Sequence, residues 1–288
     1  MANPDVKTTH ELKGEDWAGE MGERWLASLD RLETMLEPIG SALLDAAAYK
    51  PGENVLDIGS GGGRTTRLIA DDVAPGGVAV GVDVAPMLVE EAEKRAIAEG
   101  IKNAHFVCAD AGSEPLGQAP FDRMFSRFGS MFFTDPAAAF SSLRSALKPT
   151  ARIDLAVWGP PRDNAWMMEM MGVVRQHIDI PPVDPRAPGP FAFGEREYLT
   201  EILNISGFSK PEFAAFEGQI AVGGPHSSPE EAVSFVQSSM GVGRVLEGQE
   251  EEIRDRALAG LLALFDRHHV GGKGIMMGCK AWFVSATA

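Results

Sequence analysis

A glycine-rich segment, VLDIGSGGGRTTRLIA at positions 55–70, contains the first residues whose types and spacing could do chemistry. Four of the five positions from Gly59 to Gly63 are glycine, and Asp57 stands two residues before them. Glycine adopts positive φ easily and has no Cβ to keep a ligand away from the backbone. The helical pattern that follows would direct unpaired N–H groups at the same place. The segment therefore indicates either a tight turn or a site where a ligand lies against bare backbone.

The spacing of these glycines bears on which ligand could lie there. Gly59, Gly61 and Gly63 stand at alternate positions, which is not the GxGxxG spacing of dinucleotide folds, and no GxxxxGK[ST] phosphate loop is present. Asp57 would repel a pyrophosphate and attract an ammonium group. We therefore expect a nucleoside that carries an amino acid, and we regard a nicotinamide-dependent oxidoreductase as disfavoured.

Two further carboxylates stand where the next two strands are expected to end. Asp83 ends the run AVGVD, twenty positions after Gly63, and Asp110 ends the run HFVCAD. A carboxylate in the first position can accept both hydroxyls of an adenosine ribose, and one in the second could accept an adenine amino group. Each could instead cap a helix. Because ligands of open α/β sheets bind at the carboxyl ends of the strands, the combination predicts a nucleoside site.

The elements that must position these residues follow from short apolar runs that alternate with helical patterns. This alternation predicts right-handed βαβ units and a parallel sheet covered on both faces. The expected strands are Asn54–Ile58, Val78–Val82, Ala104–Ala109, Asp122–Ser126 and Ile153–Trp158. The expected helices between them are Gly63–Val73, Pro86–Glu99 and Pro136–Leu147.

Helical patterns flank this alternating region on both sides. Residues Glu20–Ala48 have apolar positions at helical spacing, with a break or kink expected at Pro38. After Trp158 come a Met-rich helix, AWMMEMMGVVRQHI, a helix at 195–206, a strand at 211–217 and about fifty residues of mostly helical pattern. The run IMMGCKAWFVSA predicts a last strand.

Composition excludes several classes of partner. The chain has 288 residues, with 26 Lys+Arg against 41 Asp+Glu and a formal net charge of −15, a field that repels nucleic acid and anionic lipid. No apolar run is long enough to span a bilayer, and the polar first residues do not resemble a signal peptide. Cys108 and Cys279 lie in apolar runs and are expected in buried strands, with neither a metal site nor a disulfide. We expect a cytoplasmic protein.

The stretch from Asn54 to Trp158 resembles the class I S-adenosylmethionine-dependent methyltransferases. VLDIGSGGG, GVDVAPMLVEEAEKRA and FVCADAG resemble the first three motifs of that family, and FDRMFSRFGSMFF with AFSSLRSALKPTARIDLAVW resembles the fourth strand, helix and fifth strand. The wider chain is similar to a bacterial small-molecule subgroup in DWAGEMGERWLASLDRLETML, PGPFAF and KAWFVSA. It departs from that subgroup at DWAG, where an Asn usually follows the Trp, and at Ser60, where Cys is common.

The resemblance implies an α/β fold with a Rossmann-like, doubly wound, seven-stranded sheet, mostly parallel with an antiparallel last strand. It also implies an N-terminal helical cap and helical lid insertions. The expected division is 1–50 for the cap, 51–158 for the cofactor-binding core, 159–195 for a lid insertion, 196–222 for more of the core, 223–272 for a second helical lid and 273–288 for the last core strand.

The resemblance also implies which residues hold S-adenosylmethionine. The glycine loop would lie under the methionine portion with Asp57 near its amino group, and Asp83 would hold the ribose hydroxyls. Arg127, just after the fourth strand, would lie near the methionine end and the methyl group. The full implied set is Trp17, Trp25, Asp57, Gly59, Ser60, Gly61, Gly63, Asp83, Val84, Met87, Asp110, Ala111, Ser126 and Arg127.

The acceptor side is less specified, because methyl transfer needs alignment and exclusion of water more than a fixed catalytic motif. As a weak base we favour His177 over His226, His268 and His269, with Arg127 as a second catalytic candidate. Flexible thioethers and aromatic rings suit an adaptable apolar pocket, although they are equally typical of a core. The expected acceptor pocket is Trp166, Met167, Met170, Phe191 and Phe193.

These features predict a methyltransferase that acts on a small, apolar or aromatic acceptor, most favourably at oxygen. The alternative is a methyltransferase-like enzyme that uses bound S-adenosylmethionine for other chemistry, such as decarboxylation or hydroxylation. A binding module with an inactive site is a third reading, disfavoured by the intact set of loop glycines and carboxylates. The expected partners are the small acceptor and a possible homodimer, without nucleic acid, membrane or metal.

Overall fold

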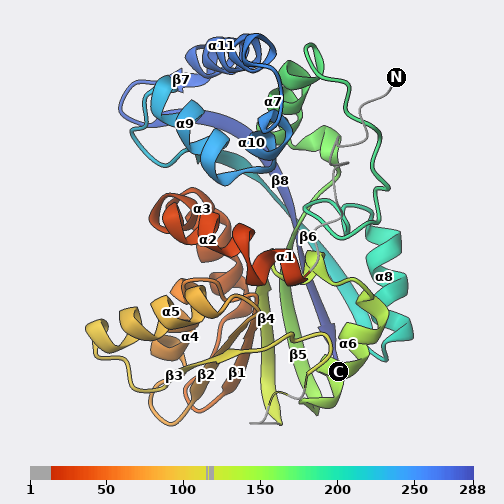
Figure 1. Ribbon diagram of the computed structural model, residues 1–288. Coiled ribbons are helices and arrows are strands. Elements are labelled where there is room, and N and C mark those ends of the chain that lie inside the picture. Colours follow the sequence, from red (N-terminus) through yellow and green to blue (C-terminus); the bar gives the residue numbers. More distant parts are fainter. Residues whose placement is uncertain (1–13, 115, 117–119) are drawn as a thin grey trace.

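A computed structural model describes residues 14–114, 116 and 120–288 of the chain (Figure 1). The expectations for the first residues, including the start of the cap and the absence of a signal peptide, concern a part that lies outside the described residues. Within them, no helix has the length and apolar character needed to cross a membrane.

A mostly parallel β-sheet forms the centre of the molecule, and its strands run in the order β3-β2-β1-β4-β5-β8-β6. Strand β8 is antiparallel to both β5 and β6, between which it lies, whereas the pairs from β3 to β5 are parallel. This confirms the predicted sheet, to which the two-residue β7 adds a short pairing with β8. The strands are β1 Asn54–Ile58, β2 Val78–Asp83, β3 Ala104–Cys108, β4 Phe121–Arg127, β5 Leu147–Trp158, β6 Ser209–Val222, β7 His269–Val270 and β8 Gly274–Thr287.

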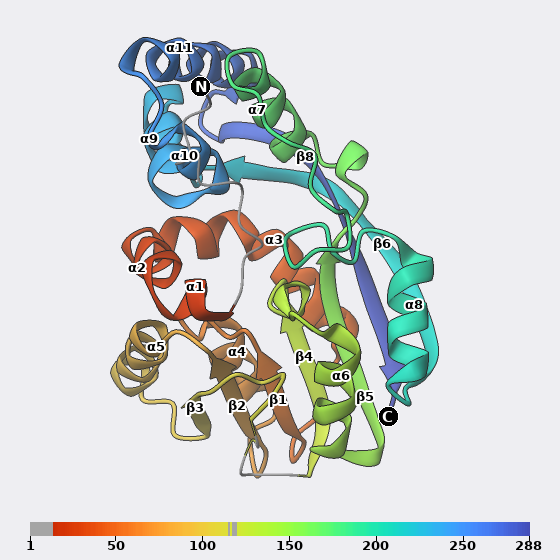
Figure 2. The same cartoon turned by 45° about the vertical axis from the view of Figure 1, so that its right-hand side comes forward.

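Helices cover both faces of this sheet because the chain winds from β1 toward β3 and later from β4 toward β6. Right-handed connections in opposite directions place their helices on opposite faces. Accordingly α3 packs on α4, and α6 packs on α8 at the other side of the sheet (Figure 2). Continuous apolar strands fill the space between, with Val55, Leu56 and Met124 fully buried. These helices are α3 Leu29–Ala47, α4 Arg64–Asp72, α5 Pro86–Glu99, α6 Pro136–Ser145 and α8 Arg196–Ile205.

The N-terminal helices contain no break at Pro38, so the predicted break is wrong, whereas the kink stays a prediction. The interruption falls at Ser28, between α2 Glu20–Ala27 and α3, and α3 continues through Pro38. The proline ring lies on the exposed side, while Met35 and Ile39 are buried next to it. Burial of the apolar stripe on both sides of the proline therefore outweighs the one helical hydrogen bond that its missing N–H cannot make.

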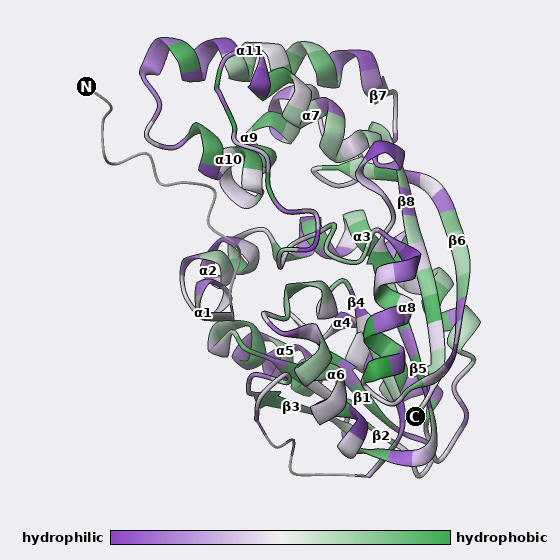
Figure 3. Ribbon diagram, turned by 90° about the vertical axis from the view of Figure 1, so that its right-hand side faces the viewer, coloured by the Kyte–Doolittle hydropathy of each residue, from purple (hydrophilic) through white to green (hydrophobic). Residues whose placement is uncertain are grey.

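A two-stranded arm extends from the sheet and carries the remaining helices. Strand β5 pairs with β8 only as far as Trp158↔Ala281, whereas β6 and β8 stay paired to Val222↔Ile275. Helices α7, α9, α10 and α11 pack on one another at this end of the molecule, and we call them the lid helices after the prediction (Figure 3). Their bounds are α7 Ala165–Arg175, α9 Pro229–Ser239, α10 Gly241–Leu246 and α11 Glu251–His268. The division into cap, core and lids stays a prediction.

Of the two cysteines, Cys279 is buried as expected, but Cys108 is exposed. Strand β3 is an edge strand of the sheet, so one side of its run HFVC lacks the cover that a central strand would have. The apolar pattern of this run therefore predicted the strand correctly, but the prediction that Cys108 is buried was wrong.

Candidate active site

A pocket lies at the carboxyl ends of the parallel strands, between the sheet edge, the N-terminal helices and the lid helices. The predicted residues that line it are Trp17, Trp25, Gly59, Ser60, Gly61, Asp83, Val84, Asp110, Ala111, Arg127, Trp166 and Met167. The predicted residues that do not line it are Asp57, Gly63, Met87, Ser126, Met170, Phe191, Phe193 and His177.

The three alternating glycines all have positive φ, at 69° for Gly59, 53° for Gly61 and 74° for Gly63, but they differ in what surrounds them. A Cβ on Gly59 would lie 2.6 Å from the Cα of Gly129, and one on Gly63 would lie 2.6 Å from the ring of Phe106. A Cβ on Gly61 would meet only the Nε1 of Trp25, at 3.8 Å. Two of the glycines are therefore required by packing, and Gly61 is the one that leaves room for a ligand.

Asp83 lies at the end of β2 with its half-buried carboxylate on the pocket. Its Oδ2 accepts a hydrogen bond from the Gly61 N–H at 2.8 Å, and its Oδ1 accepts one from the Ala85 N–H at 3.0 Å. Burial raises the pKa of this carboxyl, opposed by the backbone hydrogen bonds. Since a carboxylate has about four acceptor positions, Asp83 can hold the glycine loop and still bind hydroxyl groups in the pocket.

Asp110, after β3, reaches the same pocket from an exposed loop. Its carboxylate accepts from the Gly112 N–H at 2.9 Å and from the Ser113 Oγ at 2.8 Å, which folds the loop back on itself. The next residue, Ala111, is buried and lines the pocket. Asp110 thus shapes the loop that would meet the edge of a base, and each oxygen keeps acceptor capacity.

Asp57 lies beneath the glycine loop and does not line the pocket. Its side chain is buried, and its Oδ2 accepts hydrogen bonds from the hydroxyls of Thr65 and Thr66, both at 2.7 Å, in the first turn of α4. The Oδ1 is buried without a partner among the described residues. Burial raises the pKa of the Asp57 carboxyl to about 6, although the two threonine hydroxyls lower it. In this structure Asp57 holds α4 against β1.

Ser126 and Arg127 end β4 in different ways. The Ser126 hydroxyl donates to the carbonyl of Ile58 at 2.9 Å and accepts from the Ser130 N–H at 3.2 Å, so it is a buried link between strands. The Arg127 side chain reaches the pocket, next to Gly40 of α3, where an added Cβ would lie 3.1 Å from Nη1. Burial lowers the pKa of this guanidinium.

Aromatic rings from the N-terminal helices lie over the glycine loop. Trp17, in α1 Gly14–Ala18, packs edge-on against Trp25 at 5.5 Å and against Phe132 at 5.0 Å, measured between ring centroids. The Nε1 of Trp17 is buried with no hydrogen-bond partner in the described part of the chain. Met87 of α5 is close behind, with its Sδ 3.0 Å from where a Cβ on Gly22 would lie. The cap stays a prediction, for which Trp17 and Trp25 lie on the pocket and Met87 lies behind them.

A second aromatic group, Phe128, Trp158 and Trp166, forms the wall of the pocket toward the lid, and we call it the aromatic wall. Phe128 stacks on Trp158 with ring centroids 4.1 Å apart and an interplanar angle of 12°, and Trp158 contacts Trp166 at 4.9 Å. Phe128 has a φ of 64°, a conformation that non-glycine residues rarely adopt and that is typical of functional sites.

Several residues that line the pocket were not predicted from the sequence, notably Glu33 and the aromatic residues Phe128, Phe132, Phe133 and Trp158. The sequence did contain a feature that could have predicted the aromatic residues. The run FGSMFF directly follows β4 and Trp158 ends β5, both at the edge of the sheet where ligands bind. No sequence signal pointed to Glu33, because it lies on a helix far in sequence from the strand ends, and the sequence of that helix does not indicate what Glu33 faces.

Four of the residues predicted on the acceptor side do not line the pocket, namely Met170, Phe191, Phe193 and His177. Met170 is fully buried, and Phe193 packs with Phe140 and Tyr198 rather than on the pocket. His177 lies in the turn after α7, half-buried, with its backbone N–H bonded to Val174. Among the residues the structure describes, no histidine lines the pocket, and no cluster of His, Cys, Asp and Glu could hold a metal ion.

Comparison with known proteins identifies this arrangement. A family model described as a methyltransferase domain matches residues 55–150. Demethylmenaquinone methyltransferase of Thermus thermophilus is 30% identical over 200 residues, which cover 69% of this chain and 86% of that enzyme. The chain belongs to the class I S-adenosylmethionine-dependent methyltransferases. The predicted family and its cofactor are thus confirmed.

Two other methyltransferases match over shorter stretches. Aklanonic acid methyltransferase DauC of a Streptomyces species is 31% identical over 128 residues, and nocamycin O-methyltransferase of Saccharothrix syringae is 26% identical over 183 residues. These alignments cover 44% and 59% of this chain. The chain spans 58% and 64% of the length of these two relatives.

Solved structures show the same fold. The YcgJ protein from Bacillus subtilis superimposes with a TM-score of 0.53 and 20% identity, covering 86% of this chain and 97% of that one. Phosphoethanolamine N-methyltransferase 2 of Haemonchus contortus, solved with S-adenosylhomocysteine, gives a TM-score of 0.56 and 17% identity, covering 94% of this chain and 59% of that one. At these identities the likeness supports the methyltransferase fold alone.

Proposed function

We propose that this chain transfers a methyl group from S-adenosylmethionine to a small, apolar or aromatic acceptor, with oxygen as the favoured position. The observation that carries the proposal is one continuous pocket that joins the glycine loop and Asp83 to the aromatic wall. The relatives named for aklanonic acid, demethylmenaquinone and, at oxygen, nocamycin support a small-molecule acceptor.

The residues present fit the cofactor. Gly61 leaves open space on the pocket, and Asp83 has unused acceptor positions at the end of β2. Asp110 and Ala111 lie one strand further along, where an adenine attached to that ribose would extend. S-adenosylmethionine supplies a methyl group on a positively charged sulfonium. The protein would hold the nucleoside with these side chains and cover it with Trp17 and Trp25.

The acceptor would lie toward the aromatic wall, where Trp166 and Met167 of α7 close the pocket from the lid side. Flat aromatic surfaces favour ring-containing ligands by stacking and by burial of apolar area. A wall of this kind also excludes water, and it fixes the approach of the acceptor to the methyl group. Both effects accelerate an in-line displacement.

The first test is calorimetric titration of the purified protein with S-adenosylmethionine, S-adenosylhomocysteine and NADH. Micromolar binding of both sulfur nucleosides without NADH is the expected result. If none of the three binds, the assignment of the cofactor to this chain is wrong.

The second test is a screen of phenols, enols and carboxylic acids by mass spectrometry. We expect a product heavier by one CH₂ group, formed in equal amount with S-adenosylhomocysteine. An acceptor that changes without gaining CH₂ would contradict methyl transfer and support the alternative of non-methyl chemistry.

A further inference from the structure

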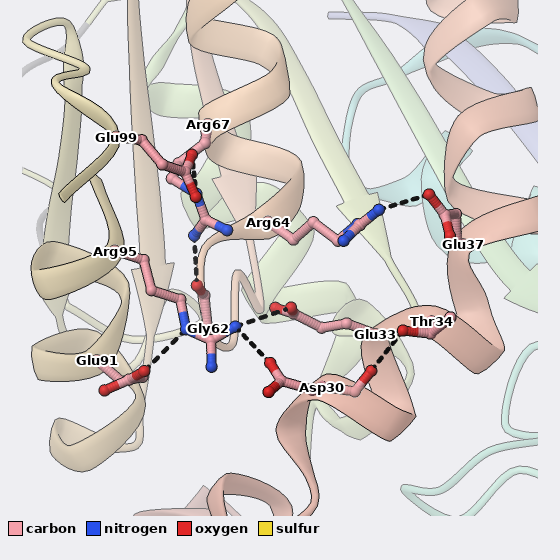
Figure 4. A network of polar contacts seen from close by, with 10 residues as sticks. All are labelled: Asp30, Glu33, Thr34, Glu37, Gly62, Arg64, Arg67, Glu91, Arg95 and Glu99. Carbon is pink, nitrogen blue, oxygen red and sulfur yellow. Dashed lines mark hydrogen bonds and ion pairs between the residues drawn. The ribbon is translucent and has the colours of Figure 1, made fainter. Parts of the chain in front are cut away.

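Glu33 of α3 is a buried carboxylate that lies directly on the glycine loop (Figure 4). Only 5% of the residue is exposed, and it lines the pocket. A Cβ added to Gly62 would lie 2.9 Å from Glu33 Oε1, so this oxygen rests on the backbone of the loop. A charge buried in this way destabilises the protein unless something pairs with it.

The protein supplies only part of that pairing. Arg95 approaches Glu33 Oε2 at 3.3 Å, but the same side chain makes shorter contacts, both of 2.8 Å, with Asp30 and Glu91. The structure shows no hydrogen bond to Glu33 Oε1 among the described residues. One oxygen of a buried carboxylate on the pocket is therefore available to a donor that the described chain does not provide.

Arg127 provides the opposite charge in the same pocket. Burial raises the pKa of the Glu33 carboxyl, and among the charged groups Arg127 opposes this rise most strongly. Within the described residues, no hydrogen bond or ion pair holds the Arg127 guanidinium, which packs against Gly40, about two helical turns beyond Glu33 on α3. The pocket thus contains one anion and one cation, each incompletely paired.

The order of the strands places this pair at one end of the proposed ligand. Asp110 follows β3, Asp83 ends β2, the glycine loop follows β1 and Arg127 ends β4, and these four strands are neighbours in that order. A nucleoside with its base at Asp110 and its ribose at Asp83 would therefore extend its amino-acid end over the loop toward Arg127. An amino acid has one ammonium and one carboxylate, which match Glu33 and Arg127 in charge.

We propose that Glu33 binds the ammonium group of the cofactor's methionine portion and that Arg127 faces its carboxylate. This assignment rests on the proposed function. It gives to Glu33 the role that the sequence suggested for Asp57, whose Oδ2 is taken by two threonine hydroxyls below the loop.

The test compares two ligands that differ only at the amino-acid end. S-adenosylhomocysteine carries the ammonium and the carboxylate, whereas 5′-methylthioadenosine has the same nucleoside and thioether without them. Calorimetric titration of Glu33→Gln should show about 10- to 100-fold weaker binding of S-adenosylhomocysteine, the usual effect of losing a hydrogen bond between charged groups. Its affinity for 5′-methylthioadenosine should equal that of the wild type. Arg127→Gln should show the same selective loss.

Glu37→Gln is the matched control. Glu37 is one turn further along α3, pairs with Arg64 at 2.5 Å and does not line the pocket. The control removes the same charge from the same helix and should leave the affinity for both ligands unchanged.

Two outcomes would overturn the assignment. If Glu33→Gln weakens both ligands equally, Glu33 merely supports the loop, and if it weakens neither, the ammonium binds elsewhere. Failure of the wild type to bind either ligand would instead reject the proposed function, and with it this inference. Binding of 5′-methylthioadenosine by the variant also shows that the variant is folded.

Discussion

The properties of the Asp57 carboxylate are determined by its contacts within the protein and not by a ligand in the pocket. It is buried, its Oδ2 accepts from two threonine hydroxyls, and its Oδ1 has no partner in the described chain. Burial disfavours the charged form more than the two hydrogen bonds favour it, so the pKa rises to about 6. The free energy of unfolding must therefore depend on the protonation of this group.

A pH-dependent stability follows from this pKa. The folded pKa of about 6 exceeds the unfolded value of about 3.9, so the folded state binds the proton more tightly. The contribution is fully present below about pH 4 and is lost as pH rises through about 6, with a total near 3 kcal/mol. Urea unfolding of the wild type and of Asp57→Asn should show this loss as a difference between their pH profiles. Parallel profiles would contradict it.

Asp83 should contribute directly to cofactor affinity. We expect Asp83→Ala to weaken S-adenosylhomocysteine binding by about 1–3 kcal/mol, because a charged hydrogen-bond partner of the ribose is lost. Asp83→Asn keeps an acceptor for the Gly61 N–H and should weaken binding less, which separates support of the loop from recognition of the ligand. Calorimetry measures the affinity of both variants. If Asp83→Ala binds S-adenosylhomocysteine as tightly as the wild type, the assignment of Asp83 to the ribose is wrong.

At the scale of elements, the pocket is closed where the N-terminal helices meet the lid helices. Arg24 of α2 forms an ion pair with Glu247, just after α10, and the Ser28 and Ser239 hydroxyls lie 2.5 Å apart. These contacts join helices more than two hundred residues apart in sequence, over a pocket whose floor is the strand ends. The site thus depends on three separate segments of the chain.

Helix α7 has two methionines with different surroundings, and they should behave differently. Met170 is fully buried, so Met170→Ala should lower the free energy of unfolding by about 2–5 kcal/mol and leave the acceptor KM nearly unchanged. Met167 is half-buried and lines the pocket, so Met167→Ala should change stability little and raise the KM for an aromatic acceptor. Thermal unfolding and steady-state kinetics check the pair. If both variants change the free energy of unfolding and the acceptor KM to the same extent, α7 does not form part of the acceptor pocket.

The elements were largely predictable because each is encoded locally. The β1 run NVLDI contains three apolar residues, two of them β-branched, and its bounds match the prediction. The bounds of α5, which starts at Pro86 and ends before Gly100, also match. The edge of the sheet at which the pocket lies could be predicted because Gly61, Asp83 and Asp110 each end or follow a strand. The position of Glu33 and the stacking of Phe128 on Trp158 could not, because both depend on how segments distant in sequence pack together.

At the scale of the whole molecule, one continuous apolar core includes α3, the sheet and the lid helices, with Leu36, Val55, Met170 and Leu261 among its members. We therefore expect a single cooperative unfolding transition, seen at the same urea concentration by tryptophan fluorescence and by circular dichroism. S-adenosylhomocysteine at about 100 times its Kd should raise the free energy of unfolding by about 2.7 kcal/mol. Two separate transitions, with only one shifted by the ligand, would show that the lid is stabilised independently of the core.

The antiparallel strand β8 lies between β5 and β6 rather than at the edge of the sheet. During synthesis on the ribosome, β8 therefore emerges after both strands that it must join. Until then β5 has a free edge and β6 has no neighbour in the sheet, and such unpaired edges readily recruit other chains. A nascent chain that stalls before residue 274 would already contain the whole glycine loop but would leave the edge of β5 and the whole of β6 unpaired, so it should aggregate more readily than the finished chain.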